Sequence, residues 1–214
     1  PSFALLIANS PAMAQLLFLL LLWSLGVIAS SPLVYLDSAL NLLNPSYFTS
    51  YLNLDDFSRE MVDAHNQKRR LHENETDLVW NQTVYEFAQS YADNYTCPED
   101  MELVHSTSSN YGENLAAGFR NASSVVDAWY NEIKDFEYDK IDQYDDGTLL
   151  ENSDPDKPIG HFTQLIWKAS SQLGCAVKQC SNYIYYTCNY YPRGNLRLIG
   201  GSSYTQNVPP LIDE

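Results

Sequence analysis

Residues 160–175 read GHFTQLIWKASSQLGC. Apolar residues recur in this stretch at i, i+3, i+4 and i+7, the spacing of one buried helical face: Phe162, Leu165, Ile166 and Ala169. The pattern predicts a short helix that begins just after Gly160, with His161 at the flank of the buried face. The simplest role for His161 is a hydrogen bond to a nearby carbonyl at the helix start. A functional role requires partners elsewhere in the chain.

The segment that follows predicts a disulfide-bonded hairpin. The strand-like runs GCAVKQ and YIYYTCNY flank the turn-like CSN. A hairpin closing through residues 180–183 places Cys175 opposite Cys188, within disulfide reach, and leaves Cys97 to pair with Cys180. The four cysteines contain no CxxC and are too widely spaced for a zinc knuckle. Disulfides in an exported protein are therefore favoured.

Composition limits the class of protein. The chain has 214 residues, of which 45% are hydrophobic and 13% aromatic, enough for one domain with one core. Its formal charge of -15 argues against nucleic acid or an anionic membrane as partner, because binding phosphate needs a basic surface. We expect a monomer without a stable membrane anchor.

Residues 1–31 predict a signal peptide. Residues 16–29 form an uncharged apolar run of the length typical of a signal-peptide core, and the start of translation is expected at Met13. The competing interpretation is a membrane anchor that also uses the flanks of the run. The rest of the chain is expected to comprise a connector at 32–55, a folded domain at 56–200 and a C-terminal tail at 201–214.

Glycosylation acceptors support export. Four Asn-X-Ser/Thr sequences occur, where chance would supply about one or two in a chain so rich in these residues, at Asn74, Asn81, Asn94 and Asn121. We therefore expect a glycoprotein that is secreted to the extracellular space or the cell wall.

Three helices are expected before the quoted stretch, at 57–70, at 84–95 and from Ser123 to Phe136. An acidic loop that carries several aromatic residues is expected at 135–157. Helices that sandwich a small antiparallel sheet are the natural solution for this order of elements, which is an α+β fold.

Four side chains form a candidate metal site. Glu132 falls at the margin of the third helix's apolar face, so we expect it to be half-buried. Glu113 lies in YGENLAAG, and His105 lies just upstream in LVHS. Together with His161 they suit a divalent cation, with zinc preferred by the imidazoles over magnesium. The alternative is that His105 and Glu113 only tie and cap loops.

The segments GHFTQLIWKASSQLGCAV and YTCNYYPRGN resemble the two signature motifs of the CAP superfamily of cysteine-rich secretory proteins, venom allergens and plant pathogenesis-related proteins. AHNQKR at 64–69 and YGEN at 111–114 support the resemblance, which covers residues 57–197 and is strongest to secreted fungal members. It implies an α-β-α sandwich (CAP/SCP fold). In that fold the motif residues line a cleft that can hold a cation: His105, Glu113, Glu132 and His161.

The resemblance also implies a ligand. Fungal members are associated with binding and export of sterols and fatty acids through an aromatic loop before GHFTQ, and here that loop carries Phe136, Tyr138 and Tyr144. The alternative is that these aromatics pin the loop to the preceding helix.

The resemblance thus implies a carrier of sterols or fatty acids. We expect the carrier to be non-enzymatic, because no residue is recognisable as a nucleophile or an oxyanion donor. One alternative is a metal-dependent hydrolase in which His105 and His161 hold zinc and Glu113 or Glu132 acts as base. The other is a non-catalytic extracellular interaction module.

Overall fold

The computed structural model describes residues 55–73, 76–107, 110–151, 154, 157–196 and 204–212. The expected signal peptide, the connector up to residue 54 and the acceptor Asn74 lie outside these residues. The domain boundaries expected from the sequence remain predictions. Within the described ranges, no helix is both long enough and apolar enough to cross a membrane.

The first described helix, α5, runs from Asp56 to Arg69, one residue earlier than expected. Asp55 caps it by accepting a hydrogen bond from the Ser58 N–H at 2.7 Å. Basic residues in the last turn complement the negative end of the helix dipole.

The sheet has four strands in the order β1-β3-β4-β2. They are β1 (Val79–Trp80), β2 (Gly112–Ala117), β3 (Gln172–Gln179) and β4 (Ile184–Tyr191). The expected hairpin is β3 and β4, and Cys175 lies directly opposite Cys188 and is bonded to it. The sheet is not wholly antiparallel as expected, because β1 pairs with β3 in parallel.

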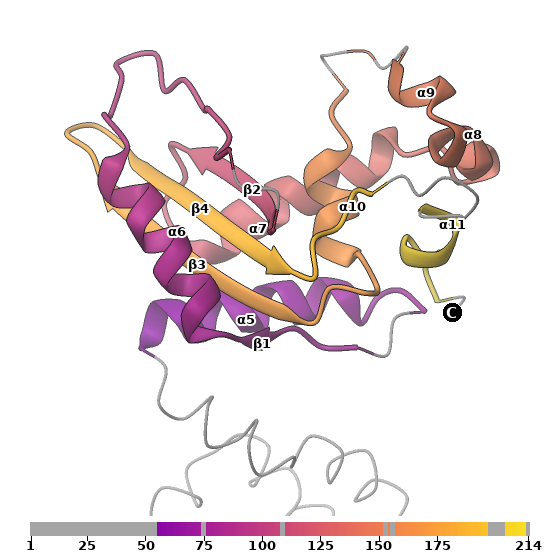
Figure 1. Ribbon diagram of the computed structural model, residues 1–214, viewed down its shortest axis with the longest axis horizontal. Coiled ribbons are helices and arrows are strands. Elements are labelled where there is room, and N and C mark those ends of the chain that lie inside the picture. Colours follow the sequence, from indigo (N-terminus) through magenta and orange to yellow (C-terminus); the bar gives the residue numbers. More distant parts are fainter. Residues whose placement is uncertain are drawn as a thin grey trace, which may run out of the picture. The chain divides into compact units, whose positions relative to one another are not determined.

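Helices cover both faces of the sheet (Figure 1), which confirms the predicted α-β-α sandwich. On one face lies α6 (Gln82–Asn94), and on the other lie α5, α7 (Ala122–Tyr130) and α10 (Gly160–Ile166). Alternate residues of β4 serve the two faces: Tyr186, Cys188 and Tyr190 join the larger apolar cluster, and Tyr185 joins the smaller one.

A glycine of the quoted stretch lets α6 approach the sheet closely. A Cβ atom at Gly174 would lie 2.1 Å from the Tyr85 nitrogen, a distance that no side chain tolerates. Any other residue there would push α6 off β3.

Buried polar groups fasten α5 to the quoted stretch. The Arg69 side chain is fully buried and donates hydrogen bonds of 2.8–3.0 Å to the carbonyls of Thr76, Leu165, Trp167 and Ser170. Burial lowers the pKa of Arg69 to about 10, so its guanidinium remains charged at neutral pH. These bonds lock the end of α10 against α5.

The helix of the quoted stretch is shorter than predicted. α10 ends at Ile166, and Ala169 is exposed and lies outside the helix, contrary to the periodicity. The reason is tertiary: Trp167 leaves the helical conformation, and its carbonyl accepts a hydrogen bond from Arg69.

The expectations for 123–157 need two corrections. The third helix, α7, is capped by Asn121 rather than by Ser123. It ends at Tyr130 and is followed by a 3-10 helix, η1 (Asn131–Asp135). The expected acidic loop is largely helical. It contains η2 (Tyr138–Lys140), α8 (Ile141–Asp146) and α9 (Thr148–Glu151).

The end of the chain contributes to the core. The short helix α11 (Tyr204–Asn207) packs against α8, and Tyr204 and Val208 are buried. Residues expected to form a tail therefore cover part of the domain.

Candidate functional site

A cleft of about 340 Å³ lies where β2, the start of α10 and the segment after β4 meet. Three of the four residues that the sequence singled out line it. Glu132 does not line it but is hydrogen-bonded to His161, which does. The lining residues are His105, Ser106, Tyr111, Gly112, Glu113, Asn114, Pro158, Gly160, His161, Gln164, Arg193, Gly194 and Asn195.

His161 and Glu132 form the first histidine–carboxylate pair. His161 Nδ1 lies 2.6 Å from Glu132 Oε1, and Oε2 accepts the backbone N–H groups of His161 and Phe162 at 2.9 and 3.1 Å. α10 has no side-chain cap of its own, so Glu132 caps it from a neighbouring element. The carboxylate replaces the carbonyl expected as the partner of His161, and it is more buried than predicted, with 11% of its side chain exposed.

His105 and Glu113 form the second pair. His105 Nδ1 lies 2.8 Å from Glu113 Oε1, and Glu113 also accepts hydrogen bonds from the Ser106 N–H and Asn189 Nδ2. Glu113 is nearly buried, whereas 63% of the His105 side chain is exposed. The bond to Glu113 raises the pKa of His105. Burial by itself would raise the pKa of Glu113, but the bonds it accepts outweigh burial and lower it.

The two pairs do not form a four-ligand metal site. Within the described part of the chain, no three His, Cys, Asp or Glu side chains are grouped closely enough to hold a metal ion. Both carboxylates are occupied by hydrogen bonds to imidazole and backbone. Their contacts orient the two histidines, as outer-shell carboxylates do.

Two polar residues that the sequence reasoning missed shape the cleft. The Asn114 side chain is buried and donates to the His161 carbonyl at 3.0 Å. Gln164, also buried, accepts the Gly194 N–H at 2.9 Å, and it packs so tightly on Gly112 that a Cβ there would lie 1.9 Å from its Oε1. The available signal was Gln164 itself, a polar residue between the apolar residues Phe162 and Leu165 of a short helix.

The three aromatic residues expected in a ligand loop are packed together. Phe136 stacks on Tyr144 with ring centroids 4.6 Å apart and meets the edge of Tyr138 at 4.7 Å. Phe136 and Tyr144 are buried, and the Tyr138 hydroxyl donates to the Pro209 carbonyl at 3.1 Å. In this arrangement the three residues hold the segment against the domain, which is the contact that the alternative expects.

The remaining predicted sites are three glycosylation acceptors and the second disulfide. Asn81 caps α6 and Asn121 caps α7, whereas Asn94 is the last residue of α6. The structure pairs Cys97 with Cys180, as expected.

Comparison with known proteins agrees with this architecture. The chain is 42% identical to Protein PRY2 of Saccharomyces cerevisiae over 73% of its length, and 39% identical to Secreted protein RBT4 of Candida albicans over 65%. It spans only 42% and 36% of those relatives' own lengths. Among solved structures, "Crystal structure of NaASP2 with Zn2+" has the same fold, with a TM-score of 0.52 at 22% identity over 67% of this chain and 83% of that one.

A model of the cysteine-rich secretory protein family, CAP, matches residues 62–190, which include both histidine–carboxylate pairs and all but the last residue of the hairpin. The chain therefore belongs to the CAP family, and it is a secreted, extracellular protein.

Proposed function

We propose that this protein is a non-enzymatic extracellular carrier of a sterol or a fatty acid, and that the segment containing α8 covers the ligand site. The observation that carries the proposal is the aromatic cluster beneath α8. Tyr144 lies between Phe136 and Tyr204, and Phe136 packs in turn on Phe162 of α10. If α8 moved outward, a continuous aromatic surface would become available to an apolar ligand.

The outer side of the same segment suits a soluble carrier. The acidic residues Asp139 and Asp142 are exposed on it. One short segment thus presents aromatic rings to the domain and charges to water. A cover that closes over an apolar ligand needs this combination.

A single carboxylate fastens α8 to the end of the chain. Asp145 accepts hydrogen bonds from the Tyr204 N–H and from the N–H and hydroxyl of Thr205. Opening the segment requires the loss of these contacts. Asp145 is therefore the residue through which the opening can be tested without removing an aromatic side chain.

We assign a second role, the binding of a divalent cation, to the cleft. This role is secondary to carrying the sterol or fatty acid. Each imidazole directs Nδ1 to a carboxylate, so His105 and His161 would offer Nε2 to a divalent cation, with zinc preferred. The related solved structure whose title names Zn²⁺ supports this assignment.

A hydrolase is the less favoured function. Glu113 has a lowered pKa, and Glu132 accepts three hydrogen bonds, so neither carboxylate is prepared to act as a general base. All four cysteines are held in disulfides and cannot act as nucleophiles.

The test measures sterol exchange on full-length secreted protein. The wild-type protein should bind radiolabelled cholesterol or palmitate with saturation, and Asp145→Asn should accelerate ligand dissociation because it loosens the cover. Asp142→Asn is the matched control, an exposed acid on the same helix. Absence of saturable lipid binding would contradict carriage. Equal dissociation rates for the two variants would contradict the role of α8.

A further inference from the structure

The connection between α6 and β2 exposes apolar side chains. Met101, Leu103 and Val104 are 40%, 41% and 58% exposed, although they lie close together in a chain of formal charge -15. Single exposed apolar residues are ordinary, but a cluster on an extracellular domain usually has something covering it.

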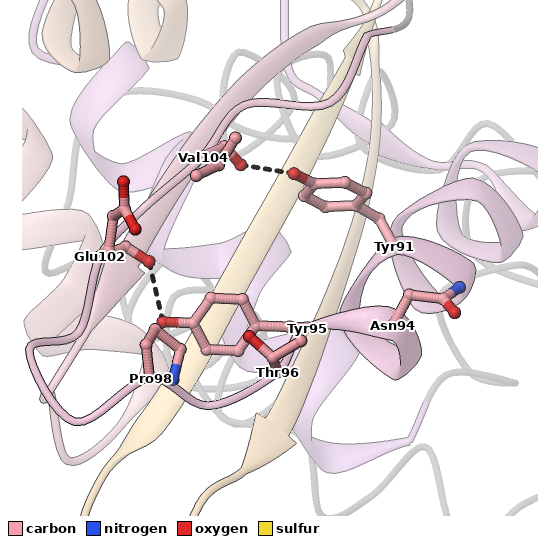
Figure 2. Close-up of a pocket in the computed structure, with 7 residues that line it drawn as sticks. All are labelled: Tyr91, Asn94, Tyr95, Thr96, Pro98, Glu102 and Val104. Atoms are coloured by element: carbon pink, nitrogen blue, oxygen red, sulfur yellow. Dashed lines mark hydrogen bonds between the residues drawn. The ribbon is translucent and has the colours of Figure 1, made fainter.

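One of these three residues, Val104, lines a small groove (Figure 2). Its volume is about 220 Å³, below the roughly 300–1,000 Å³ of sites for drug-sized ligands, so it suits one or two sugar rings better than a lipid. The residues around it are Tyr91, Asn94, Tyr95, Thr96, Pro98, Glu102 and Val104.

Hydrogen bonds hold the walls of the groove in place. The Tyr91 hydroxyl donates to the Val104 carbonyl, and the Tyr95 hydroxyl donates to the Glu102 carbonyl at 3.0 Å. The Tyr95 ring also stacks on Tyr185, with centroids 3.8 Å apart. Tyr91 of α6 and Tyr95, the residue that follows α6, are therefore fixed against the apolar connection.

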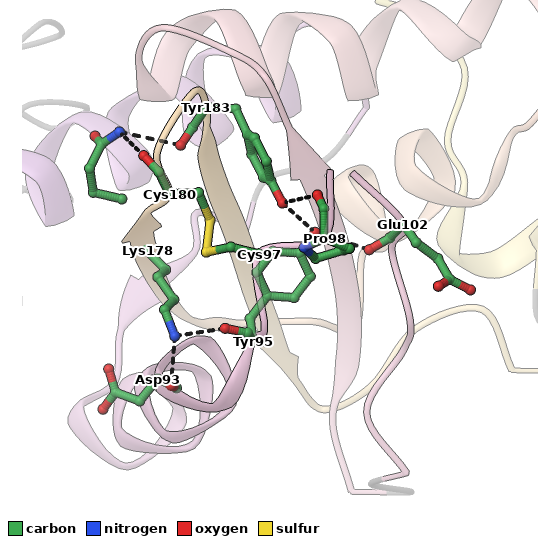
Figure 3. Close-up of a disulfide and its surroundings, with 9 residues drawn as sticks. Asp93, Tyr95, Cys97, Pro98, Glu102, Lys178, Cys180 and Tyr183 are labelled. Carbon is green, nitrogen blue, oxygen red and sulfur yellow. Dashed lines mark hydrogen bonds between the residues drawn. A yellow bond between two sulfur atoms is a disulfide. The ribbon is translucent and has the colours of Figure 1, made fainter. Parts of the chain in front are cut away.

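The base of the groove is fastened to the sheet (Figure 3). The Cys97–Cys180 disulfide ties the connection to the end of β3, and Lys178 Nζ donates to the Asp93 and Tyr95 carbonyls at 2.8 and 2.7 Å. The groove is thus formed before any ligand arrives, which lowers the entropic cost of filling it.

Asn94 lies at the rim of the groove and begins the acceptor Asn94-Tyr95-Thr96. Its side chain is exposed, and Nδ2 donates to the Ser90 carbonyl at 2.7 Å. A glycosylated amide keeps one N–H. In Figure 2 the Asn94 amide points away from the Tyr91 and Tyr95 rings, so the side chain has to turn to bring a sugar on Nδ2 into the groove. Asn81 differs, because it is half-buried and its Nδ2 is bonded to Gln172 at 2.6 Å.

We propose that Asn94 carries an N-linked glycan whose first N-acetylglucosamine lies in this groove and covers the apolar connection. In the modification step, Asn94 Nδ2 forms a bond to C1 of the sugar on a lipid diphosphate donor and loses a proton. The bond from C1 to the phosphate oxygen breaks, and the lipid diphosphate leaves. The exporting host supplies the donor and the transferase.

The chemistry of the groove fits a sugar. The apolar C–H face of a pyranose packs on tyrosine rings, while its hydroxyls remain hydrated or bond to polar groups such as Thr96 and Glu102. A glycan is bulky and hydrophilic, so it also solubilises the surface it covers. The glycan and the carrier function are independent of each other, so either proposal can fail without the other.

The test uses glycopeptide mass spectrometry and hydroxyl-radical footprinting on full-length protein secreted by a fungal host. We expect Asn94 to be occupied, and Asn94→Gln to increase labelling of Tyr91 and of the peptide containing Val104. Labelling of the exposed pair Leu211 and Ile212 should not change. Asn121→Gln is the matched control, because Asn121 is an exposed acceptor that caps another helix.

Enzymatic trimming separates the first sugar from the rest of the glycan. An endoglycosidase that leaves one N-acetylglucosamine on asparagine should preserve the protection seen in the untreated protein. An unmodified Asn94 would overturn the proposal. Unchanged labelling in Asn94→Gln, or loss of protection after trimming to one sugar, would overturn the placement of that sugar in the groove.

Discussion

Glu132 binds His161 at two points, through the ring Nδ1 and through the backbone N–H. One carboxylate therefore caps α10 and fixes the orientation of the cleft histidine. The same contact joins η1 to α10, so the shape of the cleft and the stability of the domain depend on it together.

Replacing Glu132 by Ala should destabilise the domain by about 1–3 kcal/mol, because it leaves buried N–H groups at the start of α10 without an acceptor. Glu132→Gln keeps one acceptor oxygen and should cost less. Urea denaturation followed by tryptophan fluorescence measures both. Glu137→Ala, at an exposed position paired with Lys140, is the control and should change stability little. Equal effects at 132 and 137 would show that the cap is unimportant.

Arg69→Met should cost about 3–5 kcal/mol, since it leaves four buried carbonyls without their charged donor. Arg70→Met is a matched control one residue away. Its side chain is half exposed and pairs with Asp77, so its loss should cost less than about 1 kcal/mol. Thermal unfolding of the two variants is measured side by side. Equal melting temperatures would contradict a stabilising role for the hydrogen bonds from Arg69 to the four carbonyls.

Stability should fall as the pH drops from about 6.5 to 4. His65 is fully buried between the Met61 carbonyl and the Tyr190 hydroxyl, and burial lowers its pKa to about 4. The unfolded chain therefore binds a proton in this window that the folded chain does not. The loss should reach about 3 kcal/mol at the acidic end. His72, whose pKa burial also lowers, acts in the same direction.

The pH effect can be assigned with a variant. His65→Gln should be less stable at neutral pH but should show a flatter pH dependence between 6.5 and 4. His105 works in the opposite sense, because its raised pKa stabilises the fold at low pH, but its exposure makes that contribution small. An unchanged slope in His65→Gln would rule out His65 as its source.

Removing the Cys97–Cys180 disulfide by double substitution to Ser should cost about 2–4 kcal/mol, because the bond spans 83 residues and restricts the unfolded chain. The connection between α6 and β2 should become the first site of limited proteolysis. If the protease cut another segment first and the melting temperature were unchanged, the disulfide would not stabilise the fold through this connection.

The hairpin and the layers were predictable because their determinants are local. Two strand-like runs around a short turn fix the register that places Cys175 opposite Cys188, and helical periodicity fixes which face of each helix is buried. The flank position of His161 could be predicted in the same way.

The remaining errors come from contacts distant in sequence. Ala169 leaves the predicted helix because Trp167 is held by Arg69, nearly a hundred residues earlier in the chain. Residues 135–151 fold into short helices because Phe136 and Tyr144 are buried against each other, and Phe136 also packs on Phe162. The local sequence of an acidic segment does not predict contacts with aromatic residues that are distant in the chain.

Lipid extraction followed by mass spectrometry of the protein secreted by its own host tests the carrier function most directly. Carriage predicts about one sterol or fatty acid per protein chain, and less ligand in Asp145→Asn after equal washing, because its cover is looser. Lipid-free protein that also fails to take up added sterol or fatty acid would contradict it.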